Sequence, residues 1–152
     1  MSKRISLAAA VFVFACSLAC PAQDQGYWRA ASTNANSITG DIALGKDRLT
    51  IDFASFPMTT VRVLKTEEVA AAFDADVNAG GNGDLYRVTV PAGKRFLHRN
   101  TLCGAEDTQW MATYVSGRNL QAAFFSGDKP PVLTMDALAN SMSVCGIFTY
   151  AR

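Results

Sequence analysis

The stretch Gln-Trp-Met-Ala-Thr-Tyr-Val-Ser-Gly-Arg-Asn-Leu-Gln-Ala-Ala-Phe-Phe-Ser, residues 109–126, decides the fold class. Its two apolar runs flank Gly117-Arg118, and glycine at the first central position suits the type II′ turn of a β-hairpin. Successive side chains of a strand point to opposite faces, so the first run presents two different surfaces. One face carries Trp110, Ala112 and Tyr114, and the other carries Met111, Thr113 and Val115. We therefore predict an antiparallel hairpin over residues 109–126.

Strand patterns continue on both sides of this hairpin. Around the polar turn at residues 45–48, alternation predicts a hairpin that buries Leu49, Ile51 and Phe53 and ends at Phe56-Pro57. Shorter apolar runs predict strands at residues 61–64, 85–90, 95–98 and 144–150. The predicted fold is therefore all-β and mostly antiparallel, a small barrel or sandwich of about eight strands with one short helix.

The short helix is predicted over residues 66–73, where an alanine run has high helix propensity. Thr66 can cap this helix, and Glu67 and Glu68 suit the positive end of its dipole. A further helical turn is predicted within residues 133–142. The glycine-rich residues 74–83 follow a helix and precede a strand, which is the reverse of a phosphate-binding loop, so we predict a plain flexible loop there.

Residues 1–22 contain the three parts of an export signal, namely a positive start at Lys3 and Arg4, an apolar core and small residues at the exit. The apolar core is shorter than the roughly 20 residues that a membrane-spanning helix needs, which disfavours a permanent anchor. The predicted layout is a signal peptide at residues 1–22, a tether or irregular segment at 23–36 and a single β domain at 37–152. Within the tether, the aromatic pair Tyr27-Trp28 is predicted to bury itself against the domain.

The exit of the signal allows two interpretations. Cleavage after Ala22 would release a soluble chain that begins at Gln23. Alternatively, Ser17-Leu18-Ala19-Cys20 resembles a lipoprotein box, in which Cys20 would be lipidated and would attach the protein to a membrane. Cys16 is a second, weaker candidate for lipidation because Phe14 is bulky. Both alternatives place the protein in the periplasm or outside the cell.

Two cysteines remain beyond the signal, Cys103 and Cys145. An exported pair most often forms a disulfide, and the chain holds neither a Cys-x-x-Cys motif nor enough histidines to indicate a metal site. Each cysteine is followed by glycine, which suits a bend next to a bridge. We predict a structural Cys103–Cys145 disulfide and no cofactor.

Several short motifs resemble a family of small, exported bacterial β proteins whose function is uncharacterised. These motifs are Ser37-Ile38-Thr39-Gly40-Asp41, Leu85-Tyr86-Arg87-Val88-Thr89, Asn100-Thr101-Leu102-Cys103-Gly104, Phe125-Ser126-Gly127, Pro130-Pro131 and Cys145-Gly146. In outline the pattern is also similar to small periplasmic lysozyme-inhibitor barrels. That similarity implies an architecture but no functional residues, because one fold can serve many functions.

Composition excludes some classes of protein. Among 152 residues, 49% are apolar and 18% are charged, which is inconsistent with an intrinsically disordered chain. The net charge of +1 becomes −1 if residues 1–22 are removed with Lys3 and Arg4, and no basic stretch is present. A nucleic-acid partner is therefore not expected.

Few residues suggest chemistry. His98 is the one imidazole that could act as a general base, although His98-Arg99 also fits an exposed strand end. Glu106-Asp107 is a carboxylate pair in a loop, but adjacent residues seldom reach the separation that glycoside hydrolysis needs. Trp110 and Tyr114, with Phe124 and Phe125 on the partnering strand, could line a ligand mouth or could share a core. Scattered arginines, which could surround an acidic partner or simply face solvent, are Arg87, Arg95, Arg99 and Arg118.

The sequence thus favours an exported, non-catalytic binding or inhibitory module whose partner is a protein or small ligand of unknown identity. The residues proposed for ligand contact are Trp110, Tyr114 and His98. A first alternative is a surface-anchored structural lipoprotein attached through Cys20. A further alternative is an unrecognised hydrolase that uses His98, which is less favoured because no catalytic signature accompanies that residue.

Overall fold

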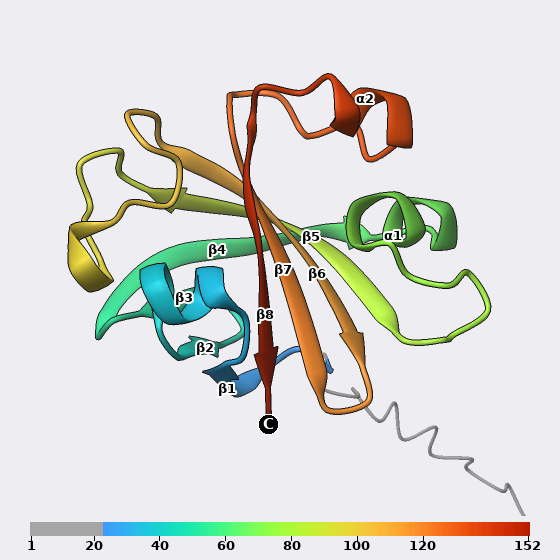
Figure 1. The fold of residues 1–152 in the computed structure, drawn as a ribbon, viewed down its shortest axis with the longest axis horizontal. Helices are drawn as coiled ribbons and strands as arrows, with labels where there is room; N and C mark the ends of the chain where they lie inside the picture. The colour runs from blue at the N-terminus through green and yellow to red at the C-terminus, as the bar shows by residue number, and fades with distance from the viewer. Residues whose placement is uncertain (1–22) are drawn as a thin grey trace, which may run out of the picture.

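Eight antiparallel strands close into a barrel in the computed structural model, which describes residues 23–152 (Figure 1). Each strand pairs with the next along the chain, and β1 pairs with β8 to close the ring. The strands are β1 (Gly26–Ala30), β2 (Ile42–Leu44), β3 (Arg48–Ile51), β4 (Ala54–Val63), β5 (Asn82–Val90), β6 (Thr108–Ser116), β7 (Asn119–Ser126) and β8 (Val144–Ala151). This arrangement confirms the predicted all-β class and identifies it as a barrel. The predicted cleavage after Ala22 and lipidation at Cys20 or Cys16 lie outside the described residues.

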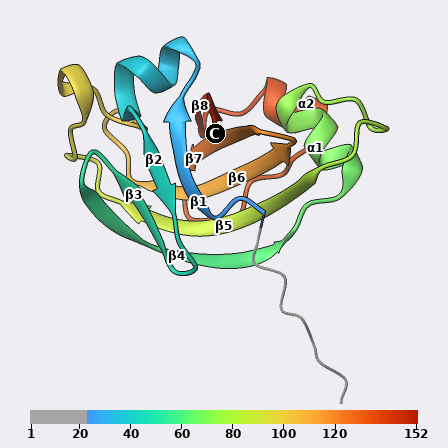
Figure 2. The ribbon, with the colours of Figure 1, turned by 90° about the horizontal axis from the view of Figure 1, so that it is seen from below.

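Short helical segments lie on two opposite sides of the barrel (Figures 1 and 2). On one side lie a π-helical turn, η1 (Ala35–Thr39), and a 3₁₀ turn, η2 (Leu97–Arg99). On the other lie two α-helices, α1 (Thr66–Phe73) and α2 (Met135–Ala139). The helix predicted over residues 66–73 is confirmed, as is the helical turn within 133–142. Within residues 23–152 no helix is long and apolar enough to cross a bilayer.

The β6–β7 hairpin forms as predicted, and its two faces belong to two separate cores. Ser116 pairs with Asn119 across a two-residue turn in which Gly117 has a φ of 58°. Met111 and Val115 point into the barrel, where they join apolar side chains from all eight strands. The opposite face, which carries Trp110, Ala112 and Tyr114, packs beneath α1 and α2. The barrel therefore has a filled interior and a second hydrophobic layer on its outer wall.

Helix α1 sits close to the sheet because Gly83 of β5 has no side chain. A Cβ atom at Gly83 would lie 2.8 Å from Cγ2 of Val69 and 3.0 Å from the carbonyl oxygen of Thr113. The first turn of α1 is held by Glu68, whose carboxylate accepts a hydrogen bond from the backbone N–H of Lys65. Lys65 is therefore the residue before the helix, and Thr66 is its first residue rather than its cap.

The prediction of a tether or irregular segment at residues 23–36 is wrong for Gly26–Ala30. Residues 26–30 form β1, which pairs with both β2 and β8, so the β domain begins before residue 37. Trp28 is fully buried, as predicted for the aromatic pair, whereas Tyr27 is 59% exposed. The strand was not recognisable because one buried side chain among exposed ones gives no period-two pattern.

Two further strand predictions need correction. Residues 95–98 form no strand, because a closed barrel leaves no free edge for an additional one, and they enter the η2 turn instead. Strand β4 is continuous through Pro57 rather than ending there. Pro57 lies at the end of the pairing with β3, and pairing with β5 begins at Met58, so its missing N–H costs no ladder hydrogen bond.

Candidate functional site

The turn between β3 and β4 places an aromatic side chain entirely in solvent. Ile51 pairs with Ala54, so the loop consists of Asp52 and Phe53 alone. Their φ angles are 47° and 62°, the left-handed values that a type I′ turn requires at both positions. Asparagine or aspartate followed by glycine is the favoured sequence for this turn. Phe53 therefore occupies a position that suits glycine.

The Phe53 side chain contributes no hydrophobic burial to the stability of the fold. Its side chain is 100% exposed, so no apolar area is buried, contrary to the prediction that it lies on the buried face with Leu49 and Ile51. A bulky residue in the left-handed region is a strained outlier, at a cost of roughly 1–2 kcal/mol. Strained residues of this kind cluster at functional sites. Phe53 is thus the strongest candidate for a contact with another molecule.

A groove of about 290 Å³ lies beside this turn, and we call it the Phe53 groove. It is bounded on one side by the β3–β4 turn and on the other by Leu97 of η2. In Figure 2 the β3–β4 end, η1 and η2 lie on the same side of the barrel. The residues that line the groove are Tyr27, Thr39, Gly40, Asp41, Ile42, Ala43, Thr50, Asp52, Phe53 and Leu97.

The floor of the Phe53 groove carries a hydrogen-bonded pair, Tyr27 and Asp41. The Tyr27 hydroxyl donates to one carboxylate oxygen of Asp41, and the other oxygen accepts from the backbone N–H of Ala30 at 2.9 Å. These bonds lower the pKa of Asp41, with the Tyr27 bond contributing most, and the same bond raises the pKa of Tyr27. At neutral pH the groove therefore combines a fixed negative charge with aromatic and aliphatic surface.

The predicted residue His98 lies in the η2 loop next to Leu97, which lines the groove, but His98 itself is not a lining residue. His98 and Arg99 follow Leu97, are both exposed and have φ angles of 53° and 63°. Two consecutive left-handed residues reverse the chain, and the backbone N–H of Phe96 donates to the carbonyl of Asn100 at 2.8 Å. The Asn100 side chain in turn donates to the carbonyl of Ser37, which fastens the loop to η1.

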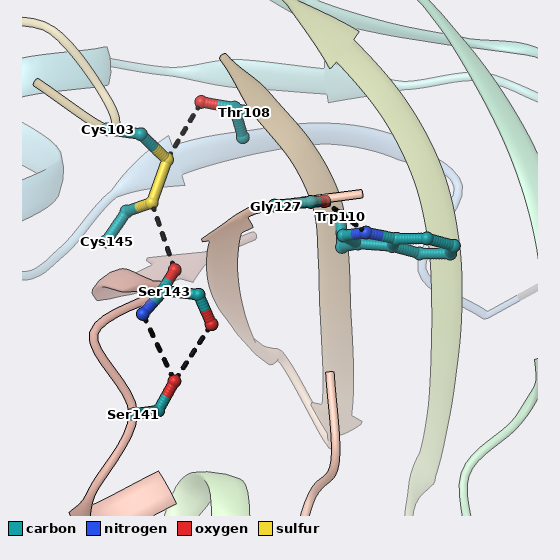
Figure 3. Close-up of a disulfide and its surroundings, with 7 residues drawn as sticks. All are labelled: Cys103, Thr108, Trp110, Gly127, Ser141, Ser143 and Cys145. Atoms are coloured by element: carbon teal, nitrogen blue, oxygen red, sulfur yellow. Dashed lines mark hydrogen bonds between the residues drawn. A yellow bond between two sulfur atoms is a disulfide. The ribbon is translucent and has the colours of Figure 1, made fainter. Parts of the chain in front are cut away.

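A disulfide between Cys103 and Cys145 anchors the other end of this loop (Figure 3). Cys103 lies just before β6 and Cys145 lies in β8, so the bridge ties the loop to a strand two places along the barrel wall. The Thr108 hydroxyl donates to the Cys103 sulfur at 3.1 Å. The predicted pairing is confirmed, and it fixes the segment that supplies one wall of the Phe53 groove.

The other residues proposed for ligand contact, Trp110 and Tyr114, lie elsewhere and are buried. The indole N–H of Trp110 donates to the carbonyl of Gly127 at 2.9 Å (Figure 3), and the Arg87 guanidinium lies 4.6 Å from the ring centre. The Tyr114 hydroxyl donates to the carbonyl of Gly80, and its ring borders a cavity of about 110 Å³ beside α1. Both side chains belong to the hydrophobic core under α1 and α2. Of the two interpretations that the sequence allowed, a ligand mouth or a shared core, the structure shows the shared core.

The charged residues that the sequence suggested for a site do not come together in the structure. Asp107 accepts a hydrogen bond from the backbone N–H of Ala92 and so holds the loop between β5 and β6. Arg95 donates to the carbonyl of Arg99, whereas Arg118 donates to the carbonyl of Arg152 at the end of β8. In residues 23–152 no three His, Cys, Asp or Glu side chains gather as metal ligands.

Comparison with protein-family models, with curated proteins and with solved structures finds no match to this chain. The family resemblance of the short motifs therefore remains an expectation. The Phe53 groove combines a fully exposed aromatic side chain, a strained turn and the fixed charge of Asp41. Sequence reasoning singled out His98, the neighbour of the lining residue Leu97, and missed the turn itself, because Asp52 is followed by Phe53 instead of the glycine that marks a type I′ turn.

Proposed function

We propose that the protein is an exported, non-catalytic binding module that recognises a partner protein through Phe53 and the adjoining groove. The observation that carries this proposal is the full exposure of Phe53 on a turn whose backbone disfavours it. A residue that neither fills the core nor suits its local conformation is best explained by a contact outside the chain. Aromatic side chains supply much of the binding energy at protein interfaces.

A protein partner is favoured because Phe53 projects outward rather than lining a deep pocket. Small ligands are usually enclosed by concave sites that bury most of their surface. A projecting ring instead suits insertion into a cleft on another protein, which is also the geometry of an inhibitory contact. The two-residue hairpin fixes the backbone at Phe53 before binding, so little backbone freedom is lost when the complex forms.

The inference of export is supported by the disulfide and by the sequence of residues 1–22. Disulfides persist in oxidising compartments, which include the periplasm and the cell exterior. The bridge also holds the loop that forms one wall of the Phe53 groove. A binding surface that depends on this bridge would be maintained in such a compartment.

Replacing Phe53 with glycine tests the proposal, because it is expected to have opposite effects on folding and on binding. The Phe53→Gly protein should be more stable than wild type by about 1 kcal/mol, since glycine relieves the left-handed strain. It should also lose capture of the partner that wild-type protein retains from extracts of the cell envelope of its natural host. Stability is measured by chemical denaturation and capture by quantitative mass spectrometry.

Met142 provides the matched control. It is 99% exposed, follows α2 in the chain and is not among the residues that line the Phe53 groove. Met142→Gly should retain every protein that wild type captures. The proposal is wrong if Phe53→Gly captures the same proteins in the same amounts, whatever its stability.

A further inference from the structure

A buried aspartate with one unpaired oxygen lies inside the barrel wall. Asp24 is 2% exposed, and one of its carboxylate oxygens accepts hydrogen bonds from the hydroxyls of Tyr86 and Thr113. Its backbone carbonyl accepts a bond from the indole N–H of Trp28 at 2.6 Å. The second carboxylate oxygen, Oδ1, is equally buried and has no hydrogen-bond partner within residues 23–152. A buried charge in this state is costly unless something neutralises it.

A second carboxylate, that of Asp84, lies close to the first. Asp84 is on β5 directly opposite Thr113, two residues from Tyr86, and is half-buried. Alternation along β5 gives Asp84 the same inward face as Tyr86. Burial raises the pKa of Asp84, and the negative charge of Asp24 raises it further. The two carboxylates therefore repel each other.

The cations within residues 23–152 do not form an ion pair with either carboxylate. The ion pairs in residues 23–152 are Arg48 with Asp47 and Arg62 with Glu68. Arg152 approaches the same segment, but its guanidinium donates to the carbonyl oxygens of Gln23 and Gln25 and lies 4.2 Å from the Trp28 ring centre. The carboxylate pair thus lacks a positive partner within the described chain.

We propose that Asp24 and Asp84 bind a divalent metal cation of the Ca²⁺ type at this position. The available groups are all oxygens, namely the free Oδ1 of Asp24, the Asp84 carboxylate and the neighbouring hydroxyls, and hard cations prefer such ligands. Because the protein supplies two carboxylates, the affinity should fall in the weak range of extracellular calcium modules, and water would complete the coordination. Asp84 is partly exposed, so a cation could approach the site from its side.

Thermal unfolding of the purified protein tests this site at neutral pH. With EDTA present, Ca²⁺ in excess over the chelator should raise the melting temperature of wild type. Asp84→Asn should melt at a higher temperature than wild type in EDTA, because the repulsion is gone, and should lose the response to Ca²⁺. Asp136→Asn, an exposed control on α2, should respond to Ca²⁺ as wild type does.

Tb³⁺ luminescence gives a direct readout of occupancy, because excitation of Tyr86 and Trp28 would sensitise a lanthanide bound to Asp24. Wild type and Asp136→Asn should show the sensitised signal, whereas Asp84→Asn should require roughly tenfold more Tb³⁺ or greater, equivalent to about 1.4 kcal/mol of binding free energy. The proposal is overturned if Ca²⁺ leaves the wild-type melting temperature unchanged. It is also overturned if Asp84→Asn retains the full Ca²⁺ response, in which case the cation binds elsewhere.

Discussion

Replacing Trp28 with alanine is expected to lower the free energy of unfolding by about 3–5 kcal/mol, the range for large aromatic residues removed from a core. Trp28 is fully buried, its indole N–H donates to the Asp24 carbonyl, and its ring contacts the Arg152 guanidinium. The side chain therefore joins β1 to the interior and to the end of β8. Equilibrium denaturation in urea gives the loss directly.

Arg29→Ala is the matched control for this change. Arg29 is the next residue of β1 and is exposed, so its replacement should alter the free energy of unfolding by no more than about 0.5 kcal/mol. A loss below about 1 kcal/mol for Trp28→Ala would fall well short of core burial. That result would mean that β1 is a loosely attached segment and that the barrel does not close through it.

Removal of the disulfide is the second change with a large expected effect. Cys103 and Cys145 are 42 residues apart, and closing a loop of that length in the unfolded chain stabilises the folded state by roughly 4 kcal/mol. The Cys103→Ser/Cys145→Ser protein should lose about this amount in denaturant titrations. Wild type unfolded in the presence of a reductant should show the same stability as the double variant.

Removal of the disulfide should also loosen the loop beside the Phe53 groove. The bridge anchors the loop that carries Leu97 and His98, so amide hydrogens of residues 96–100 should exchange faster in the double variant than in wild type. Equal stability of the oxidised and reduced proteins would show that the bridge does not constrain the fold. In that case, the groove wall is held by the Asn100–Ser37 contact and by the packing of Phe96 and Leu102 in the barrel core.

The parts of the fold that could be predicted are those where one pattern decides the outcome. The β6–β7 hairpin has a glycine turn and two largely apolar runs, so turn type, pairing and faces all follow from the sequence. The sequence did not indicate which hydrophobic core each face joins, because the same apolar pattern fits a face that packs in a barrel interior and a face that packs against a helix. The roles of Trp110 and Tyr114 therefore depend on α1 and α2, which cover them and make them part of a core.

The parts that could not be predicted depend on contacts distant in sequence. Strand β1 exists because closure requires an element between β2 and β8, which its own five residues do not signal. Phe53 continues an apolar alternation that a two-residue turn interrupts, and the absence of glycine hid that turn. Asp24 is a single acidic residue in a polar stretch, and its burial arises from Tyr86 and Thr113, both more than 60 residues away. In β1, at the Phe53 turn and at Asp24, the local conformation is thus set by the rest of the barrel and not by the neighbouring residues in the sequence.

The central claim is that Phe53 touches a partner protein, and site-specific photo-crosslinking tests it most directly. Phe53 is replaced by p-benzoylphenylalanine, which keeps an aromatic ring at the tip of the turn, and Met142 is replaced in the same way as the control. After irradiation of the natural host, the position-53 protein should form a covalent adduct with a defined second protein that the position-142 protein does not form. Identical adducts from both positions, or none from position 53, would contradict the assignment of the Phe53 groove as the binding site.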